Sequence, residues 1–131
     1  MATAIITRRN EPVATLRVEV ARNIWRRARG LMGRQRLAEN SGMLFVYPWP
    51  RVVRIWMARV PMALDVLFID RRGRVAQIAA ELRPASVQWT CSSTAVSWVL
   101  ELAAGVAERI GIAVGDRVAV HMDGAAWQPP A

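Results

Sequence analysis

Two carboxylates of this sequence lie inside apolar segments, where an acidic side chain needs a specific partner. Asp65 shares one face of a predicted strand with Leu67 and Ile69, and Glu101 is flanked by leucines. A carboxylate on an apolar face is costly unless it is paired. Two carboxylates can perform acid–base chemistry, so one hypothesis is a pocket where Asp65, Glu101 and Arg27 hold a polar ligand. We favour the alternative that Asp65 forms a buried ion pair, with Arg27 as one partner, or caps backbone N–H groups.

Trp56 and Met57 are further candidates for a ligand-binding cleft, because both offer large apolar surfaces. At strand spacing, Trp and Met more often belong to a core. If Trp56 were instead exposed beside Arg54, it would indicate a stacking platform for a sugar or a base. We therefore expect core positions and keep the platform as the alternative.

A nucleophile and a base are available only as Cys91 and His121, the single cysteine and the single histidine. Cys91 alternates with Gln88 and Thr90 on the apolar side of a predicted strand, so we predict a buried thiol. His121 is predicted to face solvent. One histidine, one cysteine and scattered acids do not make metal-ligand spacing, so we expect no metal and no cofactor.

The elements that position these residues are mostly short strands. Alternating polar and apolar residues or apolar runs predict strands at 15–20, 42–47, 52–57, 64–70, 74–80, 87–91, 96–102 and 117–122. Short helices are predicted at 24–32 and 105–110, and a type I turn at 70–73. About eight short strands and two helices predict a mainly β domain, compact and barrel-like or a sandwich.

The length of 131 residues predicts one domain over residues 1–131, with its core at about 13–122. We expect weak ends at 1–10 and 123–131, the second a flexible tail. The apolar runs are too short for a membrane span. Without a leader pattern at the first residues or a cysteine pair, a cytoplasmic location is the expectation.

Positive charge is concentrated in the first part of the chain. All 18 basic residues are Arg, and residues 1–74 hold 15 of them against 5 acids. This favours nonspecific association with anionic partners. Seven arginines are candidates for a nucleic-acid patch: Arg8, Arg9, Arg22, Arg26, Arg29, Arg34 and Arg36. They do not fall on one recognition element, so we expect no specific nucleic-acid complex.

Six segments occur in an order and at intervals that resemble the bacterial and archaeal family called domain of unknown function 192. They are Arg27-Ala-Arg-Gly-Leu-Met-Gly-Arg34, Gly42-Met-Leu-Phe45, Ile55-Trp-Met57, Leu64-Asp-Val-Leu-Phe-Ile-Asp70, Leu100-Glu-Leu102 and Gly111-Ile-Ala-Val-Gly-Asp116. The resemblance covers about residues 16–120 and implies a compact, mainly β domain without an assigned activity. One departure is Arg59-Val60, which stands where the family pattern has Asn-Thr.

These observations rank three functions. The first is a noncatalytic module that binds a small polar ligand or serves as an accessory, with Arg27, Trp56, Met57, Asp65 and Glu101 as candidate binding residues. The second is a small enzyme that acts on a polar or carbohydrate-like ligand through Asp65 and Glu101. The third is a nonspecific nucleic-acid binder that uses the arginine-rich first half.

Overall fold

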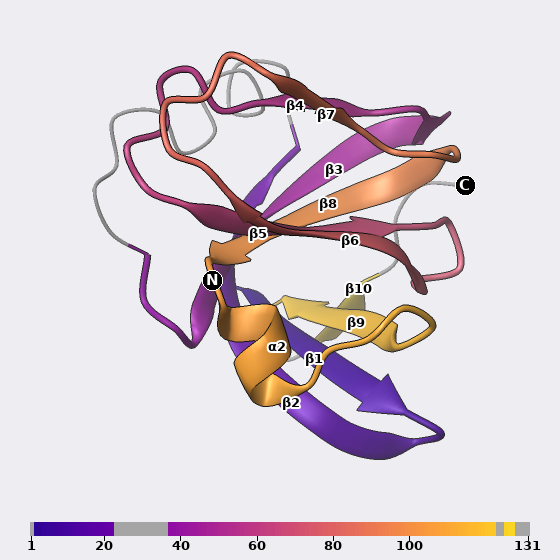
Figure 1. Cartoon of the computed structure of the whole chain (residues 1–131). Helices are drawn as coiled ribbons and strands as arrows, with labels where there is room; N and C mark the ends of the chain where they lie inside the picture. Colours follow the sequence, from indigo (N-terminus) through magenta and orange to yellow (C-terminus); the bar gives the residue numbers. More distant parts are fainter. Residues whose placement is uncertain (1, 23–36, 123–124, 128–131) are drawn as a thin grey trace.

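In the computed structural model, the described residues are 2–22, 37–122 and 125–127, and most of them lie in β-strands (Figure 1). Their elements are β1 (Ala2–Arg8), β2 (Glu11–Ala21), β3 (Ser41–Arg51), β4 (Arg54–Trp56), β5 (Leu64–Ile69), β6 (Val75–Leu82), β7 (Trp89–Cys91), β8 (Val96–Ala103), α2 (Val106–Ile110), β9 (Arg117–Met122) and β10 (Ala125–Trp127). The mainly β prediction is confirmed.

Eight strands form one sheet in the order β10-β9-β1-β2-β3-β8-β5-β6. The sheet folds over, so that β1, β2 and β9 face the layer of β3, β8, β5 and β6 (Figure 1). The larger apolar cluster fills the space between these halves and includes Ile6, Val18, Leu100 and Val118. Except for the parallel pair β2–β3, neighbouring strands of this sheet are antiparallel.

The edge strand β6 approaches β9, which is next to the other edge strand β10, and this makes the fold barrel-like without complete closure. An isolated bridge pairs Arg74 with Arg117, next to the starts of β6 and β9. Val118 N–H donates to Gly73 O at 2.7 Å, and Gly115 N–H donates to Val75 O at 2.8 Å. These bonds bring the turn between β5 and β6 against the start of β9.

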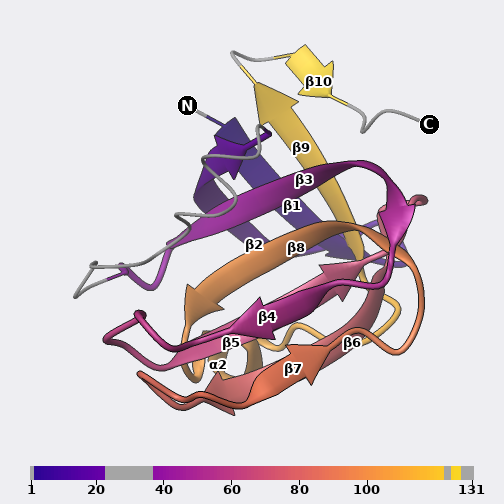
Figure 2. The same ribbon diagram turned by 90° about the horizontal axis from the view of Figure 1, so that it is seen from above.

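A second apolar cluster lies on the other face of the β3–β8–β5–β6 layer. It includes Phe45, Met57, Val66 and Val99. The cluster is covered on one side by a separate two-stranded ribbon of β4 and β7, which lies above that layer in Figure 1 and in front of it in Figure 2. The β3–β8–β5–β6 layer is therefore buried on both faces, and all six residues of β5 are buried.

The ends of the chain differ from the sequence prediction. Residues 1–10 were expected to be a weak end, but β1 is an interior strand between β2 and β9. Its inward side chains, Ala2, Ala4 and Ile6, are fully enclosed. Two of them are alanines, which is a weak hydrophobic signal in the sequence. At the other end, the short strand β10 pairs with β9 inside the segment expected to be a tail.

Local signals predicted several internal elements correctly. The turn at 70–73 is closed by Gly73 N–H donating to Asp70 O at 3.0 Å. The helix predicted at 105–110 is α2, with left-handed glycines at Gly105 and Gly111. β3 continues past Pro48 to Arg51, with an irregular pairing after Val46. The helix predicted at 24–32 lies outside the described residues. Among those described, no helix has the length and apolar character needed to cross a membrane.

Candidate functional site

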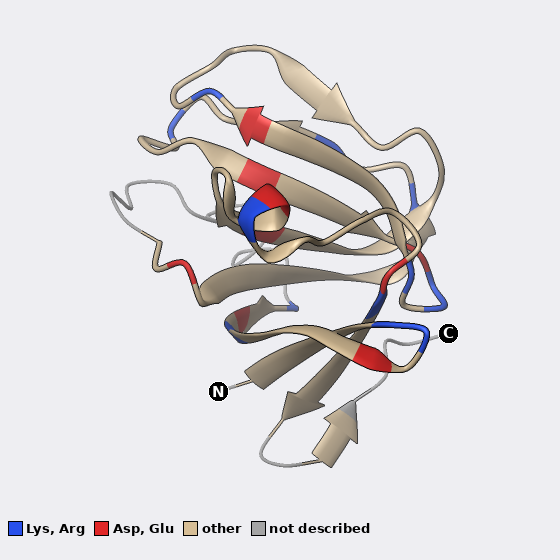
Figure 3. Cartoon of the chain, turned by 60° about the horizontal axis from the view of Figure 1, so that its bottom comes forward, with Lys and Arg blue, Asp and Glu red and all other residues tan. Residues whose placement is uncertain are grey.

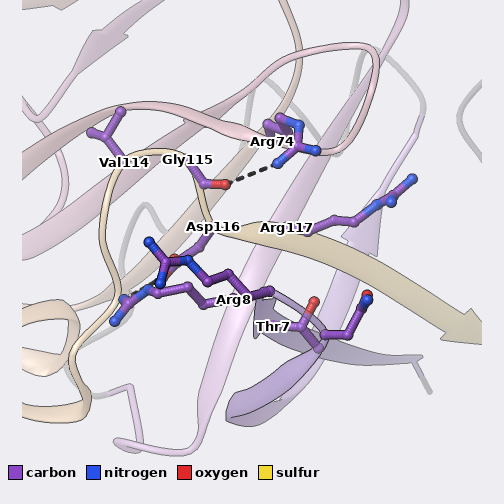
Figure 4. A pocket seen from close by; sticks show the side chains of 9 residues that line it. Thr7, Arg8, Arg74, Val114, Gly115, Asp116 and Arg117 are labelled. Atoms are coloured by element: carbon purple, nitrogen blue, oxygen red, sulfur yellow. Dashed lines mark hydrogen bonds and ion pairs between the residues drawn. The ribbon is translucent and has the colours of Figure 1, made fainter.

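An open cavity of about 550 Å³ lies where the β1–β2 turn and the β5–β6 hairpin meet the start of β9 (Figure 4). Its lining residues are Thr7, Arg8, Arg9, Asn10, Arg74, Val114, Gly115, Asp116 and Arg117. Four of the nine are arginines and one is acidic. In Figure 3, blue segments gather where these turns approach each other. The volume is within the range of small-molecule sites.

Strand pairing explains how arginines distant in the chain reach one cavity. β1 pairs with β9 so that Thr7 lies opposite Arg117. β1 then turns into β2 through Arg9 and Asn10, which have φ values of 52° and 65°. A two-residue turn with positive φ at both positions suits the twist of a hairpin but is unusual for a side chain as large as Arg. The turn therefore holds Arg9 at the rim in a conformation that glycine would adopt more easily.

One arginine of the cavity is structural. Arg8 Nε and Nη2 donate to Asp116 Oδ1 and Oδ2 at 2.7 and 2.9 Å, and Nη2 also donates to Gly111 O. Asp116 is buried and accepts a further bond from Ala113 N–H at 2.8 Å. The hydrogen bonds from Arg8 lower the pKa of the Asp116 carboxyl, and the same pair raises the pKa of Arg8. The negative charge of Asp116, the acidic residue of the lining, is thus already balanced by Arg8.

The other three arginines keep most of their donors for a ligand. Arg74 Nη1 donates to Gly115 O at 3.2 Å, which orients the side chain at the cavity wall (Figure 4). Arg9 and Arg117 are exposed, and neither forms an ion pair with another described residue. Three cations around one concavity attract anions, and guanidinium groups match phosphate and carboxylate geometry.

Asp65 is a buried cap for backbone groups, which confirms the favoured interpretation of this residue. Its Oδ1 accepts from Glu81 N–H at 2.8 Å and its Oδ2 accepts from Ala107 N–H at 2.9 Å. Ala107 is in the first turn of α2. The N-cap residue of this helix is Gly105, which has no side chain that could accept a hydrogen bond from a backbone N–H. A carboxylate at that end also suits the helix dipole. Asp65 therefore joins β5 to the end of β6 and to α2.

Glu101 does not meet Asp65. In the register of β5 and β8, Glu101 lies opposite Val66 whereas Asp65 lies opposite Leu102. Successive residues point to opposite faces, so Asp65 faces the first apolar cluster and Glu101 faces the second. Glu101 is buried, its Oε2 has no hydrogen-bond partner, and desolvation raises the pKa of its carboxyl to about 7. The two carboxylates cannot share a ligand in this arrangement.

The remaining candidate binding residues are dispersed. Met57 is buried in the second cluster, as expected for a core residue. Trp56 is 43% exposed and stacks on Trp89, with ring centroids 5.3 Å apart, so the expectation of a core position is wrong for it. Arg27 lies outside the described residues, so its predicted pairing with Asp65 stays a prediction.

The prediction of a buried Cys91 is wrong. Cys91 and Trp89 are exposed on the outer face of the β4–β7 ribbon, whereas Thr90 between them is half-buried. Trp89 and Cys91 share a face, as the alternation of a strand requires, but the ribbon packs on its other face. His121 is half-buried on β9, in a different layer from β7 (Figure 1). In the described ranges, no cluster of His, Cys, Asp and Glu suits a metal ion.

Sequence reasoning missed two of the four cavity arginines, Arg74 and Arg117. It grouped Arg8 and Arg9 with other arginines of the first half, because proximity in sequence was the available criterion. Arg117 comes from the part of the chain whose net charge is not basic. The β1–β9 pairing that brings it to Arg9 has no local signature, so a prediction of this cavity needed the strand order.

Comparisons with known proteins agree with one another. A family model, DUF192, described as an uncharacterised ACR, matches residues 4–120. A crystal structure from Sinorhizobium meliloti 1021, of a protein described only as a suspected transcription regulator, is 34% identical, with a TM-score of 0.86 over 90% of this chain and 92% of the other. A protein of unknown function from Novosphingobium aromaticivorans DSM 12444 is 32% identical, with a TM-score of 0.84 over 88% and 82% of the chains. No curated protein matches the chain.

Proposed function

The chain belongs to the DUF192 family of uncharacterised proteins, and from its own geometry we propose that it is a noncatalytic module that binds a small anionic ligand. The ligand class is a small molecule that carries a phosphate or carboxylate group. The binding site is the arginine cavity formed by Arg9, Arg74 and Arg117, with Arg8 and Asp116 as its support. No established biochemical activity is attached to the family.

The observation that carries this proposal is the charge of a concave site. Arg9, Arg74 and Arg117 bring three positive charges to one cavity, and the carboxylate of its lining is held by Arg8 at 2.7 and 2.9 Å. This excess of positive charge destabilises the folded protein, because the arginines repel one another unless a counter-ion occupies the site. An anionic ligand would relieve that repulsion and would accept bonds from the guanidinium groups.

Binding is favoured over catalysis by the chemistry of the lining. Its described residues include no His, Cys, Ser or Lys, and Asp116 is fully engaged by Arg8 and Ala113. The alternative of an enzyme that uses Asp65 and Glu101 loses its support, because these side chains lie on opposite faces of the sheet. As part of the proposal we place the protein in the cytoplasm, where its exposed thiol at Cys91 would stay reduced.

The test is thermal unfolding of the full chain at low salt with inorganic pyrophosphate and, separately, with citrate. Ligand at about a hundred times its Kd stabilises a folded protein by about 2.7 kcal/mol, a rise in Tm on the order of 5–10 °C for a chain of this size. We expect Arg117→Gln and Arg9→Gln to remove most of that rise.

Arg59→Gln is the matched control, because Arg59 is also exposed but does not line the cavity. It should keep the full rise in Tm. If the wild-type Tm does not respond to either anion, or if Arg59→Gln reduces the response as much as Arg117→Gln, the cavity is not the binding site. A rise in Tm with just one of the two anions supports the cavity as the binding site and shows whether it prefers phosphate or carboxylate groups.

A further inference from the structure

The outer face of the β4–β7 ribbon carries an exposed aromatic surface. In the ribbon register, Arg54 lies opposite Cys91 and Trp56 lies opposite Trp89. Trp56 is 43% exposed and Trp89 is 55% exposed, and the neighbouring Val87 is 73% exposed. Single exposed apolar residues are ordinary, but a contiguous group of this kind marks a binding surface more often than chance. We call these residues, Arg54, Trp56, Val87 and Trp89, the ribbon platform.

The rings of the ribbon platform are held in place. Trp56 and Trp89 are stacked, with 15° between their planes, and Arg54 Cζ lies 5.4 Å from the centre of the Trp89 ring. The indole N–H of Trp56 donates to Val87 O at 3.3 Å. Two large flat side chains fixed in this way lose little conformational entropy when a ligand stacks on them.

The ribbon itself is tied to the layer below. At its base, Val53 N–H donates to the Ser92 hydroxyl at 2.9 Å and Ser92 N–H donates to Val53 O at 2.8 Å. The side chain of Gln77 on β6 donates to Cys91 O at 3.3 Å and accepts from Ser93 N–H at 2.8 Å. The ribbon platform is therefore a supported surface on the side that Figure 2 brings to the viewer.

The chain segments that form the ribbon and its flanks carry only positive charges. Residues 45–64 and 82–100, which contain the ribbon and its flanks, include four arginines and no Asp or Glu. All four are exposed: Arg51, Arg54, Arg59 and Arg83. Arg51 Cζ also lies 5.8 Å from the centre of the Tyr47 ring. The partner that fits this surface combines flat rings with closely spaced negative charges.

We propose that the ribbon platform binds single-stranded nucleic acid without sequence preference. Bases stack on aromatic side chains, and arginines pair with the phosphates between them. Sequence tolerance follows because every base offers a π face, whereas no set of donors and acceptors on the ribbon platform reads a base edge. This proposal is independent of the arginine cavity, whose lining comes mainly from β1, β9 and the turns next to them. Figure 1 shows β1 and β9 on the opposite side of the β3–β8–β5–β6 layer from the ribbon.

The experiment measures fluorescence anisotropy of a labelled thymidine dodecanucleotide with the full chain at low salt. The matched ligand is a strand with the same number of phosphates and no bases. We expect the base-containing strand to bind more tightly than the abasic one. Trp89→Ala should weaken binding of the base-containing strand about fivefold or more, while the affinity for the abasic strand stays unchanged. Trp89→Phe should retain most of the affinity, and Arg54→Gln should weaken both strands and lower the salt dependence.

Two controls separate this proposal from charge effects and from the proposed function. Val114→Ala shortens an exposed apolar side chain at the arginine cavity and should leave the affinity for both strands unchanged. Arg117→Gln should lose the response to pyrophosphate and keep the base-dependent part of strand binding. Equal affinity for the two strands, or an unchanged affinity in Trp89→Ala, would overturn the ribbon-platform proposal. Tighter, Trp89-dependent binding of a heparin oligosaccharide would overturn it in favour of an acidic glycan.

Discussion

Replacing the buried Glu101 with glutamine should change how the stability of the protein depends on pH. Glu101 lies on β8 between Met43 and Val66 of the neighbouring strands, and its Oε2 has no hydrogen-bond partner. Burial raises the pKa of the carboxyl from 4.5 to about 7. The folded protein therefore holds a proton on Glu101 at pH values where the unfolded chain has released it.

The sign of the effect follows from proton binding. Below the unfolded pKa the carboxyl is protonated in both states and adds no dependence on pH. Between 4.5 and about 7 only the unfolded chain ionises, so the free energy of unfolding falls as pH rises, and the loss is complete above the folded pKa. At about 1.4 kcal/mol for each pKa unit, the loss amounts to about 3 kcal/mol.

The assay is urea unfolding of wild type and Glu101→Gln, followed by tryptophan fluorescence at several pH values on both sides of this interval. The difference between the two free energies of unfolding cancels the contributions of other titrating groups. We expect it to shift by about 3 kcal/mol in favour of Glu101→Gln as pH rises. Glu108→Gln, which makes the same substitution at an exposed position on α2, is measured alongside as the control for the substitution itself.

A constant difference between wild type and Glu101→Gln across this range would refute the reasoning, because Glu101 would then ionise alike in both states. A difference that moves the opposite way, with wild type gaining stability as pH rises, would also refute it. That result would mean that the folded protein stabilises the carboxylate through a cation.

Three further outcomes are expected. Asp65→Ala should lower the free energy of unfolding by about 1–3 kcal/mol for each backbone N–H left without an acceptor, and an unchanged urea midpoint would contradict the capping role. Asp116→Asn should be less stable than wild type at pH values above 3.8, the ordinary pKa of an Asp carboxyl. Because Arg8 lowers the pKa of Asp116, that deficit should shrink as pH falls through the lowered value; a deficit constant with pH would count against the ion pair. Cys91 in the native protein should react with a thiol reagent as fast as in urea, since it is exposed, and slow labelling that accelerates on unfolding would show a buried thiol.

The candidate sites were only partly predictable. Trp56 was identified from its type and from Arg54 beside it, and the stacking alternative was stated on that basis. Cys91, which shares a face with the partner Trp89, was expected to be buried, because an alternating pattern shows which residues share a face without showing which face is covered. The capping role of Asp65 was inferred from its apolar neighbours, but its two partners lie 16 and 42 residues away along the chain.

The sequence by itself determined the elements whose signals are local. The turn at 70–73 and the helix α2 between Gly105 and Gly111 follow from a few adjacent residues, and most strands follow from alternation or apolar runs. The tertiary structure decided which surfaces these elements share. It placed Asp65 and Glu101 on opposite faces, because their register in β5 and β8 differs by one residue and strands alternate with a period of two. It also gathered the arginine cavity from β1, the β5–β6 hairpin and β9, since long-range strand pairing, unlike a turn or a helix cap, leaves no pattern in neighbouring residues.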